Sequence, residues 1–428
     1  MRRAMFALCA LLLLAGCLQS GIIEDKDDVR ELDDAAVTTV VIWHTYSDEE
    51  TRVFEEEVIP AFEREHPDIR IESVRQASNQ AYLGALMTRA AADKTPDLIR
   101  LDYGWVPQFA SSGLLAPLDR MPDYEAIAGQ LHERMLDTNR LGEHVYGLPL
   151  NIATKAAIFN RRLLEEAGLS RPPATLKEVV ELAERRHYVI GMSGVDPWGS
   201  LPYFFGLGGK LSDEGFTRTN GYLNSEGSVR AVETLVRLFR EGVINPHLLD
   251  GLGDQWKGVY DGDQILMIDE GPWYYSILMN AASLDVDLME ATIPVPFPTD
   301  GAYGSIVGGE SLVMTKGTKA KEEAWAFIRW MTRKETQASM FAAGLIPTNV
   351  NAMQAAHDAG AGTSTSTPYI GPYLEGIDEA FFRPAIPQWN EIELLYKQAI
   401  ESVFVEGADV KEALDEASTA IDALLAGD

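Results

Sequence analysis

From residue 37 onward, short runs rich in β-branched residues alternate with longer amphipathic runs, and this alternation constrains the fold more than any other feature of the chain. Residues 37–43, 69–74 and 97–101 are mostly apolar, as strands buried on both faces of a sheet require. Residues 49–65 and 81–92 have the length and pattern of helices. Strands separated by helices of this size predict βαβ units and a parallel sheet.

The same alternation begins again after residue 150, where Thr175 and Glu178 have the spacing of a capping box. We expect helices over residues 175–185, 228–240, 321–332, 392–405 and 410–425, and strands over residues 265–268 and 312–314. The chain has 428 residues, and a single compact core rarely grows beyond about 250–300 residues. An α/β pattern that restarts once in a chain of this length predicts two lobes.

The N-terminus has the pattern of a secretory signal peptide. Two arginines precede an apolar run over residues 4–14, which is followed by alanine and glycine. The run is too short to span a bilayer as a permanent helix. We therefore expect residues 1–16 to be removed when the protein is exported.

The residues around the expected cleavage site predict a lipid anchor. Leu14-Ala15-Gly16-Cys17 resembles the lipobox of bacterial lipoproteins, in which the cysteine is acylated and becomes the first residue. Residues 18–36 are acidic and poor in apolar side chains, which is typical of a flexible tether. Residues 17–36 would thus hold a soluble body at the cell envelope, facing the periplasm or the exterior, through membrane lipid at Cys17. An ordinary signal peptide cut elsewhere is the alternative.

Composition and motifs argue against several classes of function. The net charge of −29 repels phosphate backbones, so we expect no nucleic-acid partner. The two cysteines are Cys9, inside the expected signal peptide, and Cys17, so the sequence predicts no disulfide and no cysteine-bound metal. The seven histidines lack metal-binding spacing, and no G-x-S-x-G motif occurs. We therefore expect no metal, cofactor or catalytic site, although paired acids such as Asp269 and Glu270 leave a glycosidase as an alternative.

Three blocks of sequence together resemble a known family. The first contains Trp43-His44-Thr45-Tyr46, Thr95-Pro96-Asp97-Leu98-Ile99, Asp102 and Trp105. The second contains Tyr146-Gly147-Leu148-Pro149, Phe159-Asn160-Arg161 and Ala167-Gly168-Leu169. The third contains Gly271-Pro272-Trp273, Gly308-Gly309-Glu310 and Gly344-Leu345-Ile346-Pro347-Thr348. In this order and spacing, over roughly residues 37–425, they resemble the extracellular solute-binding proteins of family 1, the sugar-binding subunits of ABC importers.

The resemblance implies an α/β clamshell of the type II periplasmic-binding-protein kind, with a central sheet flanked by helices in each lobe. The N-terminal lobe would comprise residues 37–150 plus 304–348, and the C-terminal lobe residues 151–303 plus 349–428. A carbohydrate would be captured between the lobes by hinge closure and delivered to the ABC permease and its ATPase. The protein would be a monomer and would perform no chemistry itself.

The resemblance implies a sugar or sugar-like ligand, and the residue types near the expected cleft indicate its charge. A phosphorylated ligand would need several arginines or lysines there, and few lie among the candidates, so we expect a neutral di- or oligosaccharide. Two other functions stay open at this point. A surface-anchored glycosidase would turn its substrate over, and a lipoprotein receptor or adhesin would bind a partner without ligand-dependent closure.

Candidate ligand contacts follow from the chemistry of a sugar, which has an apolar face suited to aromatic rings and a rim of hydroxyls suited to polar side chains. Ligands usually lie at the carboxyl ends of strands in open α/β sheets. The residues that follow the first three expected strands are therefore candidates, namely His44, Tyr46, Ser78, Asn79, Asp102 and Trp105. Packing within loops or cores is the alternative for each of them.

The second half of the chain supplies further candidates. Trp198 is expected on a turn, where stacking on a ligand is easier than burial. The resemblance assigns a stacking aromatic to Trp273 and places Gly309 and Glu310 at a returning crossover. Arg383 and Trp389 are plausible contacts from the second lobe. By contrast, Trp43, Trp325 and Trp330 lie within regular elements and are expected in the core.

Overall fold

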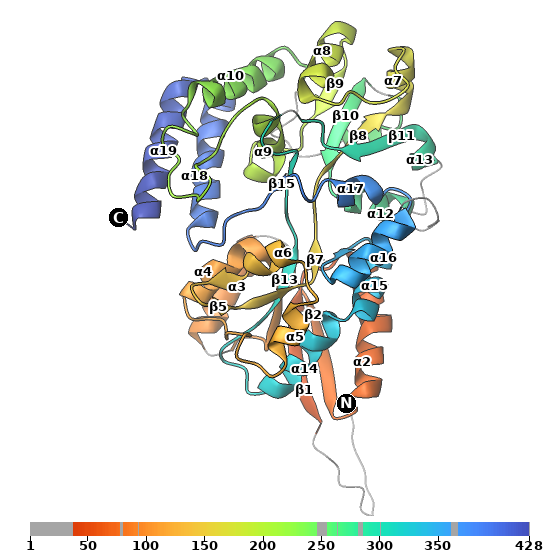
Figure 1. Ribbon diagram of the computed structural model, residues 1–428, viewed down its shortest axis with the longest axis vertical. Helices are drawn as coiled ribbons and strands as arrows, with labels where there is room; N and C mark the ends of the chain where they lie inside the picture. Colours follow the sequence, from red (N-terminus) through yellow and green to blue (C-terminus); the bar gives the residue numbers. More distant parts are fainter. Residues whose placement is uncertain are drawn as a thin grey trace, which may run out of the picture. The chain divides into compact units, whose positions relative to one another are not determined.

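Two large sheets with helices packed on them organise the described part of the chain (Figure 1). The computed structural model describes residues 37–77, 80–92, 94–245, 255–262, 264–280, 286–299, 301–360 and 367–427. The expected signal peptide and tether, with Cys17, lie outside the described residues, as do Ser78 and Asn79. We call the larger sheet with its helices the first lobe and the smaller sheet with its helices the second lobe.

The first lobe is built on a five-stranded sheet with the order β2-β1-β3-β13-β6. Its strands are β1 (Thr38–His44), β2 (Ile69–Arg75), β3 (Leu98–Asp102), β6 (Gly147–Pro149) and β13 (Glu310–Met314). As predicted, β1 lies parallel to β2 and β3. In contrast, β13 runs antiparallel to both β3 and β6, so the chain returns at residue 310 to complete this sheet.

Alternate residues of these strands face two separate apolar cores, so both faces of the sheet are covered. Ile42 and Leu98 belong to one core, and their neighbours Trp43 and Ile99 belong to the other. The first core also contains residues of α2 (Ile59–Glu65) and α14 (Lys321–Met331), and the second contains residues of α3 (Gln80–Ala91) and α4 (Val106–Ser111). The expected core tryptophans are confirmed as buried, namely Trp43, Trp325 and Trp330.

The helix expected over residues 49–65 is interrupted. It comprises α1 (Asp48–Val53), a π-helical turn η1 (Phe54–Val58) and α2. Pro60 at the start of α2 has no N–H for the regular helical ladder, which accounts for a wider turn just before it. Ser47 caps α1, and its hydroxyl and the Glu50 carboxylate form a reciprocal capping box.

The second lobe is built on a four-stranded sheet with the order β11-β8-β10-β9. Its strands are β8 (Ala156–Asn160), β9 (Val189–Gly191), β10 (Ile265–Glu270) and β11 (Thr292–Pro296). The sheet is mixed, because β8 is antiparallel to β10 and β11 while β9 is parallel to β10. β11 contains two prolines, which have no N–H group to donate. They are tolerated because β11 is an edge strand, and an N–H on its outer side would have no partner strand.

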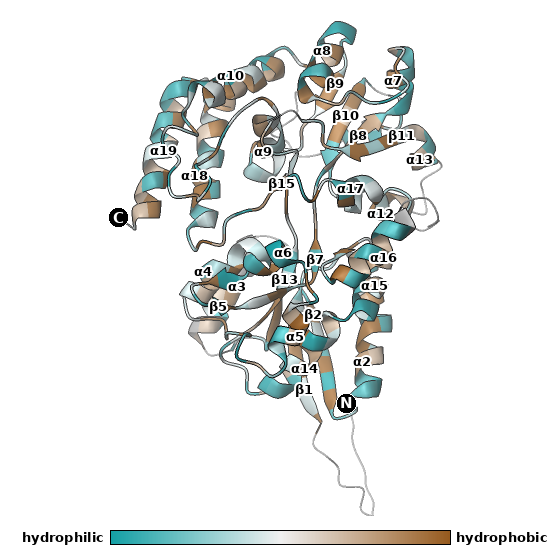
Figure 2. Ribbon diagram, in the orientation of Figure 1, coloured by the Kyte–Doolittle hydropathy of each residue, from teal (hydrophilic) through white to brown (hydrophobic). Residues whose placement is uncertain are grey.

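Helices surround this second sheet. The expected helices over 175–185, 228–240, 392–405 and 410–425 are confirmed within a few residues as α8 (Leu176–Arg186), α10 (Glu226–Arg240), α18 (Trp389–Glu401) with η3 (Ser402–Glu406), and α19 (Val410–Ala426). The capping box of Thr175 and Glu178 at the start of α8 is also confirmed. In Figure 2 strands such as β8 and β10 carry apolar residues, and hydrophilic residues gather on surrounding helices such as α8.

The remaining elements are short helices and strand pairs. They are η2 (Tyr103–Trp105), α5 (Tyr124–Ala128), α6 (Glu133–Asp137), β4 (Arg140–Leu141), β5 (His144–Val145), α7 (Arg161–Glu166), α9 (Pro197–Gly206), α11 (Gln255–Gly258), α12 (Trp273–Met279), α13 (Leu288–Ala291), α15 (Lys334–Ala342), α16 (Val350–Gly360) and α17 (Gly371–Glu375). None of the helices in the described part of the chain is both long enough and apolar enough to cross a bilayer.

Chain segments that connect the lobes are hydrogen-bonded to one another. The short strand β7 (Asn151–Ile152) pairs with β14 (Ile346–Pro347), and Ala153 forms a bridge with Gly308. A further pair joins β12 (Ser305–Ile306) to β15 (Ala380–Phe381). The connection is therefore a bundle of neighbouring extended segments. The expected division of residues between the lobes stays a prediction.

A buried lysine directly precedes β8. Lys155 forms an ion pair with Asp269 of β10, and both side chains have no exposed surface. The ammonium also donates to the hydroxyl of Ser193 at 2.7 Å and to the carbonyl of Trp198 at 3.0 Å. Asp269 accepts a further hydrogen bond from the hydroxyl of Tyr203 at 2.7 Å. These contacts hold the Lys155 side chain inside the second lobe. They therefore fix the position of the chain where it enters that lobe.

Replacing Lys155 with methionine should lower the free energy of unfolding by about 3–5 kcal/mol, because Asp269 would keep a buried charge without its partner. The double replacement Lys155→Met with Asp269→Leu removes both charges and should recover most of that loss. Urea unfolding followed by circular dichroism measures both effects. A single variant as stable as the wild type would contradict the role given to this ion pair.

Candidate functional site

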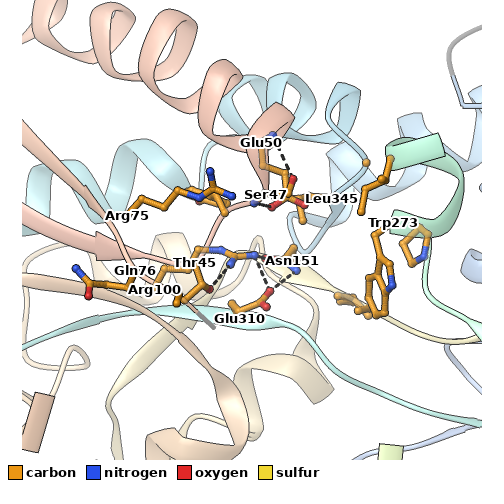
Figure 3. Close-up of a pocket in the computed structure, with 17 residues that line it drawn as sticks. Thr45, Ser47, Glu50, Arg75, Gln76, Arg100, Asn151, Trp273, Glu310 and Leu345 are labelled. Carbon is orange, nitrogen blue, oxygen red and sulfur yellow. Dashed lines mark hydrogen bonds and ion pairs between the residues drawn. The ribbon is translucent and has the colours of Figure 1, made fainter. Parts of the chain in front are cut away.

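A pocket with a volume of about 710 Å³ lies where strand ends of the first lobe meet α12 of the second. Figure 3 shows its lining, which draws on the ends of β1 and β2, on α1, on the crossover at β7 and on α12. The residues are Thr45, Tyr46, Ser47, Glu50, Arg75, Gln76, Ala77, Arg100, Asn151, Ile152, Ala153, Pro272, Trp273, Ile277, Glu310, Gly344 and Leu345.

Arg100, in the middle of β3, forms the centre of the polar wall. Its side chain is only 3% exposed, and it donates to Glu310 Oε2 at 2.7 Å and to Asn151 Oδ1 at 3.1 Å. It also donates to the hydroxyl of Thr45 at 3.1 Å, and its guanidinium lies 4.2 Å from the ring centroid of Tyr46. Acceptors from three chain segments thus hold one cation in a fixed plane.

The carboxylates of Glu310 and Glu50 and the amide of Asn151 complete this wall. Asn151 donates to the same Glu310 oxygen at 2.7 Å, and Glu310 keeps 26% of its side chain exposed toward solvent. Glu50 accepts from the backbone N–H of Ser47 at 2.9 Å and lies beside Ser47 in Figure 3. Burial raises the pKa of Glu50, and Arg100 opposes that shift. These groups offer both donors and acceptors to a hydroxylated ligand.

A second arginine enters the pocket from the end of β2. Arg75 pairs with Asp48 at 2.5 Å and is 44% exposed. Arg75 and Arg100 are thus both balanced by carboxylates of the protein, and the wall combines strong hydrogen-bonding groups with little net charge.

An aromatic surface forms the opposite wall. Trp273 opens α12 directly after Pro272, and Figure 3 shows its ring facing the polar group around Arg100. The ring stacks on Trp198, with centroids 5.8 Å apart and planes inclined by 29°. A side chain at Gly271 would collide with the Trp273 ring, and one at Gly308 would come within 2.9 Å of Trp198. Both glycines therefore make room for this pair of indoles.

The structure brings three of the predicted contact residues to the pocket, namely Tyr46, Trp273 and Glu310. Gly309 lies beside them with a φ of +134°, where a side chain would collide with the backbone of Asn151. Trp198, which was expected on a turn, lies in the first turn of α9, where its ring stacks on Trp273 and its carbonyl accepts from Lys155. These residues form a connected set around one cavity.

His44 lies behind the pocket and is fully buried. Its Nε2 atom is 2.8 Å from the hydroxyl of Ser73, and its ring packs against Tyr46 and Phe54 at centroid distances of 4.9 and 5.3 Å. Burial lowers the pKa of His44 to about 4, and the positive charges of Arg100 and Arg75 contribute. A neutral imidazole therefore supports the Tyr46 ring at neutral pH.

The other predicted contacts lie away from this pocket. Arg383 pairs with Asp102 at 2.9 Å and stacks over Tyr103, with its guanidinium carbon 4.2 Å from the ring centroid. Trp105 packs on Phe109 at the start of α4. Trp389 is 1% exposed in the core of the second lobe, against rings of Phe216 and Phe381. None of these four candidates is among the residues that line the pocket.

Several pocket residues were missed by the reasoning from sequence, and some of them had a signal. Arg100 is a charge in the middle of an otherwise apolar strand, which marks a position where burial needs partners. Glu50 stands three residues after Ser47, the spacing of a capping box. Arg75 directly follows the expected second strand, whereas Asn151 has no local signal beyond its place after Gly-Leu-Pro.

The described residues include no group of three or more histidine, cysteine, aspartate or glutamate side chains that could hold a metal ion. The pocket itself has a different chemistry. Carboxylate, amide and guanidinium groups face an indole across the pocket. This combination suits a ligand with one apolar face and many hydroxyls.

Comparison with known proteins gives consistent results. A model of the family described as bacterial extracellular solute-binding protein matches residues 47–338. A chain of Brucella abortus (strain 2308) described as a binding protein is 24% identical over 381 residues, covering 86% of this chain and 89% of that one. The melibiose/raffinose/stachyose-binding protein MelE of Bacillus subtilis (strain 168) is 24% identical over 366 residues, covering 82% and 81%.

A solved structure shows the same fold. The GacH receptor of Streptomyces glaucescens GLA.O, whose crystal structures include the unliganded form and a complex with acarbose, has a TM-score of 0.78 to this chain. The match has 24% sequence identity and covers 91% of this chain and 98% of that chain. The predicted two-lobed α/β clamshell of type II is thereby confirmed.

Stability should fall as the pH drops from about 6.5 to about 4, because protonated His44 is favoured in the unfolded chain and disfavoured in the folded one. Between pH 7 and pH 4.5 this residue should account for a loss of about 2–3 kcal/mol. Urea unfolding of the wild type and of His44→Gln at both pH values isolates its share from that of the carboxylates. Equal pH dependence in the two proteins would show that His44 does not titrate in this way.

Proposed function

Because the chain belongs to the family of bacterial extracellular solute-binding proteins, we propose that it is the substrate-binding component of an ABC importer and that its ligand is a neutral di- or oligosaccharide. One observation carries this proposal. The indole of Trp273 and the polar group of Arg100, Asn151 and Glu310 face each other across one pocket. A pyranose ring between them would place its C–H face on the indole and its hydroxyls on the polar wall.

The charge of the pocket supports a neutral ligand. Arg100 is paired with Glu310 and Arg75 with Asp48, so both cations that line the pocket already have carboxylate partners. A phosphate or carboxylate ligand would have to displace one of these partners. A hydroxyl can instead add hydrogen bonds to the oxygens and nitrogens that remain accessible. The sugar names of relatives such as MelE support the same class.

Capture by closure follows from where the two walls are placed. The polar wall lies on the first lobe and Trp273 on the second, and a ligand that touches both favours the arrangement that brings them together. The paired connecting segments at β7, β14 and Gly308 would bend during this motion. The closed protein would then dock on the permease, and ATP hydrolysis in a partner subunit would drive transport. The protein would act as a monomer and catalyse no reaction.

The glycosidase alternative depends on two adjacent carboxylates that do not line the pocket. Asp269 is buried and paired with Lys155. Glu270 is 2% exposed, and burial raises its pKa to about 7. A raised pKa suits a general acid, but an acid must reach the glycosidic oxygen. The position of both groups inside the second lobe therefore favours binding over hydrolysis.

The location of the protein forms a second part of the proposal. We propose that Cys17 is acylated and that residues 18–36 tether the lobes to the membrane surface, facing the periplasm or the exterior. The lipobox-like residues 14–17 and the acidic, apolar-poor segment after them support this. Capture close to the membrane would keep the loaded protein within reach of its permease.

Mass spectrometry of the protein purified from a bacterial membrane should show an N-terminus at Cys17 that carries acyl chains. The Cys17→Ser variant should lack the acyl mass and leave the membrane fraction after any cleavage. A mature protein that begins at another residue, or an unmodified Cys17, would contradict the anchor. Sugar binding by the soluble part serves as the control that the variant is folded.

Removing the Trp273 side chain should weaken sugar binding by about 10- to 100-fold, because a fully used aromatic contact contributes about 1.5–3 kcal/mol. A thermal-shift screen of residues 37–428 against mono-, di- and oligosaccharides and sugar phosphates identifies the ligand, and calorimetry then compares the wild type with Trp273→Ala. Tyr146→Ala removes a half-buried ring outside the pocket and should bind normally.

Other outcomes of that screen would reject parts of the proposal. A sugar phosphate that binds while neutral sugars do not would overturn the neutral ligand. Appearance of cleaved product would establish the glycosidase. If no solute shifts the melting temperature while a protein partner does, the receptor or adhesin alternative is correct.

A further inference from the structure

A second cavity continues the pocket outward between α1 and α12. It has a volume of about 540 Å³ and shares Ser47, Arg75 and Ile277 with the main pocket. Its own lining consists of Asp48, Glu49, Arg52, Ser276 and Asn280. We call it the outer cavity. Because residues are shared, the two spaces adjoin along α12, and we call them together the groove from Trp273 to Asn280.

One face of α12 forms a wall along the whole groove. Trp273, Ile277 and Asn280 are spaced at i, i+4 and i+7, which places them on the same side of a helix. Trp273 and Ile277 line the main pocket, and Ile277 and Asn280 line the outer cavity. Seven residues of helix span about 10 Å. An aromatic ring, an aliphatic side chain and an amide thus follow one another in the outward direction.

The outer cavity is polar but its charges are paired within the protein. Asp48 pairs with Arg75 at 2.5 Å, and Arg52 pairs with Glu49 at 2.7 Å. Asn280 is exposed and donates to the carbonyl of Ser276 at 2.8 Å. Ile277 is 45% exposed and gives both cavities an aliphatic surface. Paired ions, an amide and one aliphatic surface suit a further sugar ring better than an ion.

Trp198, Arg383 and Asn390 line neither the main pocket nor the outer cavity. The indole of Trp198 stacks on Trp273 and lies close to Gly308. Arg383 pairs with Asp102, and Asn390 donates to the carbonyl of Gly104 at 3.2 Å. These contacts join the second lobe to the first. A ligand in the main pocket can therefore grow past Ile277 without displacing any of them.

We propose that the ligand is a linear oligosaccharide of at least three rings, whose inner rings lie beside Trp273 and whose outer end lies in the outer cavity against Ile277 and Asn280. This proposal rests on the proposed sugar-binding function. It states that the outer cavity, separately from the main pocket, determines how long a sugar is preferred. Affinity should then rise with chain length until the outer cavity is filled.

The test is calorimetry with two series of sugars of increasing length, maltose to maltotetraose and melibiose, raffinose and stachyose. In the series that binds, the tri- or tetrasaccharide should bind about tenfold more tightly than the disaccharide. The Asn280→Trp variant fills the outer cavity, and it should remove this gain while it leaves disaccharide binding as in the wild type. Glu226→Trp adds the same bulk to an exposed position on α10 and should bind all lengths normally.

The outcomes separate the two proposals. If the disaccharide binds as tightly as the longer sugars, or if Asn280→Trp changes neither, the outer cavity is not a ligand site and the sugar-binding function stands. If Asn280→Trp weakens all lengths equally, the cavity does not act separately and the assignment of length to it is wrong. If no sugar of either series or of the wider screen binds, both proposals are overturned.

Discussion

The buried guanidinium of Arg100 is the interaction on which the binding region depends. A cation with 3% of its side chain exposed is stable only when acceptors surround it. Here they come from Thr45 after β1, Asn151 at the crossover and Glu310 at the start of β13. Satisfying one charge therefore fixes three distant chain segments relative to each other before any ligand arrives. The polar wall is preorganised, so little side-chain entropy is lost when a ligand binds to it.

The same principle of internal pairing extends to the rest of the binding region. Arg75 is paired with Asp48, Arg383 with Asp102 and Lys155 with Asp269, so a chain with a net charge of −29 has locally balanced charges at these positions. Under the proposed function, binding free energy would then come from directional hydrogen bonds and from contact with Trp273. Such a pocket would discriminate stereoisomers of the proposed sugar, because each hydroxyl that loses its partner leaves a buried polar group unpaired.

The sequence predicts the fold better than it predicts the site, for physical reasons. Apolar runs and helical spacing identify β1, α8 and α10 because these patterns are local. The edge strand β11 escapes prediction since its prolines argue against a strand. Tyr46, Trp273 and Glu310 could be named from strand ends and from the family resemblance. The pairing of Asp102 with Arg383, 281 residues apart, depends on tertiary structure that no local pattern records.

The place of β13 in the first sheet has a consequence for how the protein is made. Strand β3 ends at Asp102, but its neighbour β13 ends only at Met314, so the sheet stays open while the intervening chain is synthesised. At typical rates of synthesis that interval lasts roughly 10–40 s. During this time β3 presents an unpaired edge, and the acceptors from Glu310 that Arg100 needs do not yet exist. The nascent chain therefore cannot complete its first lobe before β13 has been synthesised. A chain that folds this late can still pass through a narrow channel in an extended form.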